Sequence, residues 1–387
     1  MKNASKIILV MLLAFTLIFV GCGQQEQSKQ SEAAETTAAP VTTTQAKAVQ
    51  TTAAAPTTVA PTTTEVAAIY PGKAGKITVY ISGPATMIEK LEQKFEAQRG
   101  DVIDIYHAGC GPLRQKVWAE AEANNLQADV FWGSNPLIYY MLDEKGLLDP
   151  YKSKQVDSFM PEYQLPDANF SLTNARYEVL VFNKQNLNKQ TAPQAFGDLM
   201  DSQWLDKMAY TDLSQSSTAF ALSTALWDMF GKKMTFFEGI KANNALIVPK
   251  SKTVADKIQS GEIEVGIVPH DAIFRLTKKA KKEGYESNLG FNWPKDGAIR
   301  LERPIAIIKN DARPPENQAL AEEFVDFILS KEAQNLMLKF GFVSVRGDVE
   351  MVKGIPEDLK VTTVDWKEAG KSEQMIREDF KAIMSGN

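Results

Sequence analysis

Hydrophobic and polar positions along this chain follow two periods that predict short strands alternating with helices. Short β-branched or aromatic runs indicate strands, and runs with apolar side chains three or four positions apart indicate helices. The turn after each of the first three predicted strands is rich in Gly, Ser or Pro. This order predicts an α/β fold in which a parallel sheet is covered by helices on both faces. The three strand–helix pairs lie over residues 76–81 and 87–99, 102–107 and 113–124, and 128–132 and 137–142.

The same two patterns continue in the second half of the sequence. Residues 157–173 show neither period, so we expect irregular structure there. Strands are expected over the apolar segments 177–183, 208–211, 264–268, 289–293 and 304–308. Helices are expected over 195–199, 204–208, 219–230, 254–260, the segment with Phe274 and Leu276, and 317–340.

The first 22 residues predict an export signal. Lys2 and Lys6 precede an apolar segment over 7–20, and a small glycine comes just before Cys22. The apolar segment is short for a membrane span, and polar residues follow it directly. Its ending, Phe-Val-Gly-Cys over 19–22, resembles a bacterial lipobox, which implies lipidation of Cys22. A plain signal peptide is the alternative.

Residues 23–68 are rich in Thr, Ala, Gln, Ser and Pro and almost free of large apolar side chains. Such a segment buries too little surface to offset its ordering entropy, so we expect a disordered tether. As a flexible coil it would reach on the order of 40 Å. It would hold a folded domain away from a membrane surface.

Composition and charge set broad limits on function. The 387 residues leave room for two domains, and a formal charge of −5 argues against a nucleic-acid partner. The two cysteines, Cys22 and Cys110, lie in such different contexts that a disulfide is not expected. With two histidines and one unlipidated cysteine, we expect neither a zinc site nor another metal or cofactor.

Small and hydroxyl-bearing residues recur where predicted strands meet the helices that follow them. For one such turn alone, helix capping explains the pattern better than ligand contact. Several turns brought to one cleft, however, would direct N–H and O–H donors at an anion. The candidate ligand-binding residues in these turns are Ser82, Gly83, Thr86, Gly109, Gly111, Ser134, Asn135, Asp212, Ser216, Ser217 and Thr218.

Two motifs indicate a family. The sequence Ala-Asp-Val-Phe-Trp-Gly over 128–133, followed by Lys-Gly-Leu-Leu-Asp-Pro-Tyr over 145–151, resembles the extracellular solute-binding proteins of ABC importers. The most similar branch contains ferric-iron, phosphonate and sugar-phosphate binders. The resemblance runs from about Lys76 to Val349. It implies the two-lobed type II periplasmic-binding-protein fold, with a ligand cleft between the lobes.

The resemblance also implies where the chain crosses between lobes. Residues 69–176 and 299–342 are expected to form lobe 1, and residues 177–298 and 343–387 are expected to form lobe 2. Residues 174–177 are the first hinge candidate.

Three more candidate ligand residues follow from the resemblance. His270 and Asp271 come after a buried strand and face the cleft in the family, and Arg176 near the hinge could pair with a bound anion. A capping role for His270 and a surface role for Arg176 remain alternatives. Iron-binding relatives are expected to carry adjacent tyrosines in this region, but this chain has Val-Pro-His-Asp-Ala-Ile-Phe over 268–274. This departure argues against ferric iron.

We therefore expect a binding protein rather than an enzyme. It would capture a small-molecule anion, phosphorylated or phosphonate-type, and deliver it to an ABC permease and its ATPase. The protein would be a monomer held on the outer face of a bacterial membrane by its lipid anchor.

Other functions remain open at this point. A ferric-iron binder is the first alternative, followed by a secreted hydrolase or transferase on the same fold and a sensor or adhesion lipoprotein. Cys110 near His107 suggests a nucleophile, but no third orienting group is evident. Contact between Cys110 and His270 would favour an enzyme. Gly109-x-Gly111 lacks the third glycine of a dinucleotide-binding motif.

Overall fold

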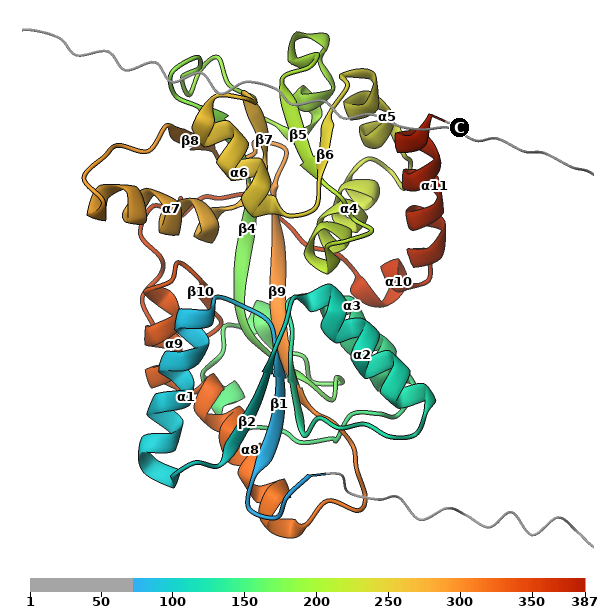
Figure 1. Cartoon of the computed structure of the whole chain (residues 1–387), viewed down its shortest axis with the longest axis vertical. Coiled ribbons are helices and arrows are strands. Elements are labelled where there is room, and N and C mark those ends of the chain that lie inside the picture. Colours follow the sequence, from blue (N-terminus) through green and yellow to red (C-terminus); the bar gives the residue numbers. More distant parts are fainter. Residues whose placement is uncertain (1–71, 387) are drawn as a thin grey trace, which may run out of the picture. The chain divides into compact units, whose positions relative to one another are not determined.

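The structure is a computed structural model and describes residues 72–386 (Figure 1). The predicted export signal, the predicted tether over 23–68 and Cys22 lie outside these residues. Among the helices of residues 72–386, none is both long and apolar enough to cross a bilayer.

The described part of the chain forms one mixed sheet system with helices on both sides. The main strand order is β2-β1-β3-β9-β4-β7-β5-β6, with β8 and β10 paired to β4 and β11 paired to β9. The strands are β1 (Ile77–Ile81), β2 (Ile103–His107), β3 (Val130–Trp132), β4 (Ser171–Asn183), β5 (Met208–Thr211), β6 (Leu246–Val248), β7 (Val265–Pro269), β8 (Leu289–Asn292), β9 (Ala298–Ile307), β10 (Val343–Ser344) and β11 (Val361–Thr362).

The helices largely follow the predicted strand–helix alternation. The α-helices are α1 (Ala85–Arg99), α2 (Cys110–Glu122), α3 (Pro136–Glu144), α4 (Ser217–Met229), α5 (Thr235–Ala242), α6 (Ser251–Ser260), α7 (His270–Lys282), α8 (Pro315–Leu329), α9 (Lys331–Leu338), α10 (Trp366–Gly370) and α11 (Glu373–Ser385). Short 3-10 helices are η1 (Lys154–Ser158), η2 (Pro161–Tyr163), η3 (Phe196–Met200) and η4 (Ser202–Trp204).

Two long antiparallel strands, β4 and β9, connect two halves of this sheet system (Figure 1). From Ser171 to Tyr177, β4 pairs with β9, and from Glu178 to Asn183 it pairs with β7 and β8. We call the half with β1, β2 and β3 lobe 1 and the half with β5, β6 and β7 lobe 2. The change of partners falls at the end of the predicted hinge over 174–177.

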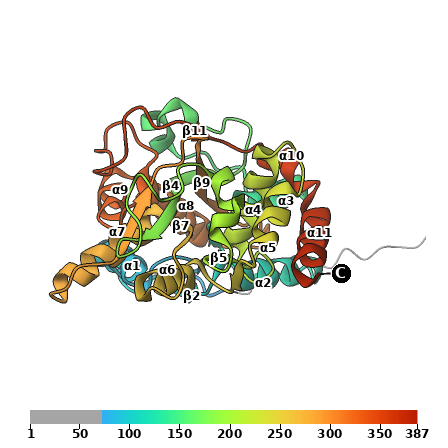
Figure 2. The same ribbon diagram turned by 90° about the horizontal axis from the view of Figure 1, so that it is seen from above.

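Helices cover both faces of the lobe 2 sheet (Figure 2). Leu180 and Phe182 of β4 pack in one apolar cluster with residues of α4, α5 and α11. Val179 and Val181, which point to the opposite face, pack in another cluster with residues of α6 and α7. Because both faces of β4 are covered, side chains that point to either face are apolar, and the strand is a continuous apolar run in the sequence.

Several boundaries differ from the sequence-based expectation. β4 already begins at Ser171, inside the segment expected to be irregular, because its first residues pair with β9. The long helix expected over 317–340 is divided into α8 and α9 at Ser330, whose side chain caps α9 by accepting the N–H of Ala333. The helix expected over 195–199 is the short η3, whereas the one expected over 204–208 is wrong: η4 ends at Trp204, a turn follows, and β5 begins at Met208.

The predicted lobe boundaries need one adjustment. Val343 and Ser344 of β10 pair with Ala175 and Asn174 in the lobe 1 portion of β4. Residues 343–387 were expected in lobe 2, yet this segment begins in lobe 1. A strand of two residues, such as β10, is too short to show a period in the sequence, so its pairing with β4 could not be predicted.

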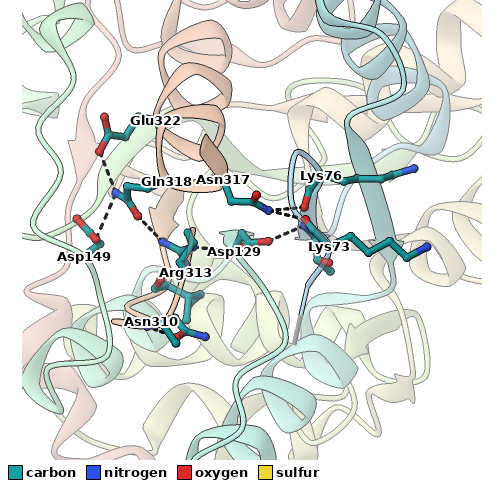
Figure 3. Close-up of polar contacts among 12 residues, drawn as sticks. Lys73, Lys76, Asp129, Asp149, Asn310, Arg313, Asn317, Gln318 and Glu322 are labelled. Carbon is teal, nitrogen blue, oxygen red and sulfur yellow. Dashed lines mark hydrogen bonds and ion pairs between the residues drawn. The ribbon is translucent and has the colours of Figure 1, made fainter. Parts of the chain in front are cut away.

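A buried polar network fixes the end of lobe 1 that carries the 128–133 motif (Figure 3). Asp129 accepts the N–H of Thr78 and pairs with Arg313 at 2.8 Å, and both charged groups are almost fully buried. Asn317 at the start of α8 binds the backbone at Lys73 and Lys76. The acidic residue of the motif therefore has a structural role at the start of β3, while the glycine end of the motif points to the other edge of the sheet.

Candidate functional site: a cleft between the two lobes

A cavity of about 530 Å³ lies between the lobes, where strands of both lobes end. Lobe 1 contributes the turns after β1, β2 and β3, and lobe 2 contributes the turns after β5 and β6 and the first turns of α7. The lining residues are Ser82, Gly83, Pro84, Gly109, Cys110, Gly111, Pro112, Ser134, Arg176, Gln215, Ser216, Ser217, Thr218, Pro249, Lys250, Ser251, Lys252, Asp271, Arg275, Arg303 and Phe342.

Helix N-termini from both lobes surround this cavity. In lobe 1, α1 and α2 begin at Ala85 and Cys110; in lobe 2, α4 and α6 begin at Ser217 and Ser251. The first N–H groups of a helix have no partner within it, and the helix dipole makes this end positive. Backbone donors of four helices therefore favour an anion in the cleft.

Arg303 forms part of the cavity lining although it is only 2% exposed. Its Nη2 donates to the carbonyl oxygen of Ser82 at 2.5 Å, and its guanidinium lies 5.4 Å from the ring centre of Phe342 and 5.8 Å from that of Trp132. Within the described residues its Nε has no hydrogen-bond partner. Burial, followed by repulsion from Arg176, lowers the pKa of Arg303 to about 10, so the group remains a cation at neutral pH.

Arg176 of β4 is the second arginine at the cavity. Its Nη2 donates to Oγ1 of Thr218 at 3.0 Å, and its buried Nε has no partner among residues 72–386. The two arginines come from the two strands that connect the lobes. Because buried guanidinium donors are costly to leave unpaired, a ligand that supplies acceptor oxygens would be stabilised here.

Gly83 lies directly against Arg303 of this pair. It has a φ of 147°, and a Cβ there would be 3.1 Å from Nη2 of Arg303. Gly111 lies on the other side, where a Cβ would be 3.4 Å from the carbonyl oxygen of Gln215 in lobe 2. Both glycines thus permit close approach of the lobe 1 turns to the rest of the cavity.

Asp271 supplies a negative charge to the lining. It is fully buried, pairs with Arg275, and its Oδ1 has no partner within the described chain. Burial would raise the pKa of Asp271, but the charges of Arg275, Arg176 and His270 outweigh it and hold the pKa below the usual range. The carboxylate therefore stays ionised and can accept a hydrogen bond from a ligand.

Positive charge predominates among the residues that line the cavity. Five basic residues accompany the one carboxylate, and these are Arg176, Lys250, Lys252, Arg275 and Arg303. Together with the helix N-termini, they make the cleft suited to an anion that also presents a hydrogen-bond donor to Asp271.

Most predicted site residues line this cavity, but four do not. Thr86 is an exposed residue in the first turn of α1, and Asp212 accepts bonds from the Ser214 N–H and the Gln215 side chain in its own turn. Asn135 is fully buried beside the cavity, where its side chain caps α3 and contacts lobe 2. The fourth is His270.

His270 has a structural position behind the cavity. It is fully buried, and its Nδ1 lies 2.9 Å from the backbone nitrogen of Tyr177 and 3.2 Å from its carbonyl oxygen. Cys110 accepts the N–H of Ser134 at 3.5 Å, and His107 contacts the carbonyl of Gly83. The hydrogen bonds of Cys110 and of the two histidines are thus with backbone groups.

The sequence interpretation missed several lining residues. The sequence did contain a signal that Arg303 is a candidate site residue. Leu-Glu-Arg-Pro over 301–304 places a cation directly before a predicted buried strand. Lys250 and Lys252 follow β6, which is only three residues long and was not predicted. Arg275 was expected on a helix, but its direction toward the cleft depends on how α7 packs.

This chain is similar to known proteins in both sequence and structure. The family described as "Bacterial extracellular solute-binding protein" matches residues 128–372. A Salmonella typhi protein named "Putative 2-aminoethylphosphonate-binding periplasmic protein" is 26% identical over 266 residues, which is 66% of this chain and 73% of that protein.

Two solved structures show the same fold. The periplasmic binding protein AfuA from Actinobacillus pleuropneumoniae, with exogenous fructose-6-phosphate bound, has a TM-score of 0.67 and 24% identity, covering 81% of this chain and 99% of that one. Iron-bound HitA from Pseudomonas aeruginosa also has a TM-score of 0.67, at 20% identity and 79% and 99% coverage. The predicted two-lobed type II periplasmic-binding-protein fold is thereby confirmed.

The family match agrees with the fold, and both agree with a cavity between the lobes whose geometry suits an anion. Members of this family bind small solutes outside the cytoplasm and work with ABC permeases. The chain belongs to the bacterial extracellular solute-binding protein family.

Proposed function

We propose that the cleft captures a small phosphorylated or phosphonate-type organic anion for import. The observation that carries this proposal is the pair Arg176 and Arg303, whose buried Nε atoms have no partner among the described residues. A phosphoryl or phosphonyl group offers several acceptor oxygens and matches guanidinium geometry. The helix N-termini of both lobes add further donors.

The ligands of similar proteins support this choice. The Salmonella typhi protein is named for 2-aminoethylphosphonate, and the AfuA structure holds fructose-6-phosphate. HitA holds iron, which keeps ferric iron as the alternative. The five basic residues of this cleft would repel a ferric cation, whereas they attract a phosphate-type anion.

Capture would work by bridging rather than by chemistry. A ligand bound to Arg176 and Arg303 would also reach Ser82 in lobe 1 and Ser217 in lobe 2. Because these contacts form together only when the lobes are close, the ligand would stabilise the closed arrangement. The closed protein would then deliver the solute to the permease and its ATPase. In this proposal the protein is a binding protein and not an enzyme.

The location of the protein follows in two steps. The family is extracellular, so the binding lobes act outside the cytoplasm. We further infer that lipidated Cys22 anchors the chain to the outer face of the membrane, that residues 23–68 act as the tether, and that the protein works as a monomer.

The test is thermal unfolding of the full chain with separate additions of fructose 6-phosphate, 2-aminoethylphosphonate, inorganic phosphate and ferric citrate. A ligand present at about 100 times its Kd stabilises the native state by about 2.7 kcal/mol. A higher midpoint with a phosphorus compound, lost in Arg176→Gln, supports the proposal. A shift with ferric citrate alone would overturn it in favour of iron.

A further inference from the structure

A second hollow between the lobes has a different character from the ligand cleft. Its volume is about 850 Å³, and it lies where α1 and α9 of lobe 1 face α7 of lobe 2 (Figure 1). Its lining residues are Lys90, Gln93, Lys94, Ala97, Gln98, Arg275, Lys278, Lys279, Lys282, Glu332, Leu336, Lys339 and Phe340. We call this hollow the α1–α7 groove.

The α1–α7 groove concentrates positive charge on a chain whose net charge is −5. Seven of its lining residues are basic and one, Glu332, is acidic. Glu332 pairs with Lys94, and Arg275 pairs with Asp271. Within residues 72–386, however, four lysines of the groove form no ion pair: Lys90, Lys278, Lys282 and Lys339. Unpaired like charges repel one another, so a negatively charged partner would stabilise this surface.

The groove also has an apolar floor. Leu336 and Phe340 lie there beside Ala97, and Leu336 is only 7% exposed. A flat anionic surface such as a lipid bilayer would touch the lysines at the rim but would not reach this recessed leucine. An amphipathic helix fits better, because it carries an apolar face for the floor and charged residues for the rim.

We propose that the α1–α7 groove is the docking site for an acidic amphipathic helix of a partner protein. Its apolar face packs on Leu336 and Phe340, and its carboxylates pair with lysines from both lobes. Since α1 belongs to lobe 1 and α7 to lobe 2, the partner contacts both lobes at once. It therefore distinguishes one arrangement of the lobes from another.

Arg275 connects this groove with the ligand cleft. It lines both hollows, pairs with the cleft residue Asp271, and donates to the carbonyl oxygen of Phe340 at 3.2 Å. A helix seated on Phe340 thus lies one side chain away from the cleft.

The experiment measures binding of a fluorescently labelled, designed 18-residue helix, with glutamates on one face and leucines on the other, to the full chain by anisotropy. A triple variant, Lys90→Glu, Lys278→Glu and Lys282→Glu, reverses unpaired positive charges on both walls. The matched control, Lys184→Glu, Lys233→Glu and Lys360→Glu, makes the same charge change at exposed lysines outside the groove. We expect about tenfold or greater weakening in the first variant and less than about twofold in the control.

Two further measurements separate the partner classes. A peptide of the same composition with its glutamates and leucines scrambled should bind at least about fivefold more weakly, because it has no apolar face for the floor. Equal binding of both peptides would overturn the proposal, as would equal weakening by the two triple variants. Stronger lysine-dependent binding to phosphatidylglycerol vesicles than to the helix would also overturn it, in favour of a lipid surface. None of these measurements depends on which ligand the cleft binds.

Discussion

The side chain of Asn135 in lobe 1 contacts Ser217 in lobe 2, with Nδ2 lying 2.8 Å from Oγ and 3.2 Å from the carbonyl oxygen. Next to it, Oγ of Ser134 lies 3.3 Å from Oγ1 of Thr218. The N-terminus of α4 is thus held directly against the turn after β3. Ser134, Ser217 and Thr218 also line the cavity that the two arginines line, so the proposed ligand site and this contact between lobes share residues.

Removing the Ser217 hydroxyl should weaken ligand binding with little effect on folding. Ser217→Ala deletes a lining group and one of the two bonds from Asn135, and each such bond contributes about 1 kcal/mol. We expect about fivefold weaker binding of the phosphorus ligand found in the thermal panel, measured by calorimetry. Ser260→Ala, at the exposed end of α6, is the control. Unchanged affinity in Ser217→Ala would remove Ser217 from the site.

Arg176 should require its guanidinium and not only its charge. Arg176→Gln removes the cation, and we expect the affinity for the same ligand to fall by about 10- to 100-fold, as for the loss of a charged hydrogen bond. Arg176→Lys keeps the charge but loses the planar fork, so its affinity should lie between those of the wild type and Arg176→Gln. If the lysine variant bound the ligand as tightly as the wild type, the planar guanidinium of Arg176 would not be needed for binding.

Glu178 should give the protein a distinctive dependence of stability on pH. This carboxyl is 1% exposed in β4, and burial raises its pKa to about 7, although Arg176 opposes the shift. Between about pH 4.5 and 7 the unfolded chain releases this proton while the native state keeps it. The contribution of Glu178 is therefore fully present below about pH 4.5 and is lost as the pH rises through 7.

Urea unfolding at several pH values tests this expectation. Relative to Glu178→Gln, the wild type should lose about 3 kcal/mol of unfolding free energy between pH 4.5 and pH 8. The glutamine variant should be the more stable protein at pH 8. Parallel curves for the two proteins would show that Glu178 titrates normally.

The ion pair between Arg114 of α2 and Glu373 of α11 should favour the closed arrangement of the lobes. Glu373 also pairs with Arg377, at 2.8 Å, and α11 packs in the lobe 2 cluster. Glu373→Gln leaves two arginines facing each other without a counter-charge, so we expect the lobes to separate more readily. Small-angle scattering of the ligand-free protein should show a larger radius of gyration. Lys371→Gln in the exposed turn before α11 is the control.

The buried pair Asp129–Arg313 should matter for stability and not for ligand affinity. Asp129→Asn leaves the Arg313 guanidinium buried without its carboxylate, which costs about 3–5 kcal/mol. We expect a lower thermal midpoint but an unchanged ligand Kd at temperatures where the variant is folded. Combining it with Arg313→Met should recover part of the loss. A changed Kd would link this end of lobe 1 to the cleft.

Local patterns explain why much of the fold was predictable. The strand–helix pairs around β1, β2 and β3 were expected from periodicity, and the turns after them do line the cleft. Helix capping, which explains one such turn taken alone, is what Asn135 does at the start of α3, where its side chain accepts the N–H of Leu137. Where pairing is distant, as for Ser171 with Ile305, periodicity gives no information about partners.

By itself, the sequence determined the α/β alternation, the family motif over 128–133 and the glycine- and serine-rich turns, since these depend on neighbouring residues. Tertiary structure alone decided which charges meet. Arg303 and Arg176 reach one cavity because β9 and β4 lie side by side, although 126 positions separate them in the chain and only Arg176 was a candidate. It also brought Asn135, a ligand candidate, into contact with Ser217 of lobe 2. Long-range pairing fixes such neighbours, and a local pattern carries no record of it.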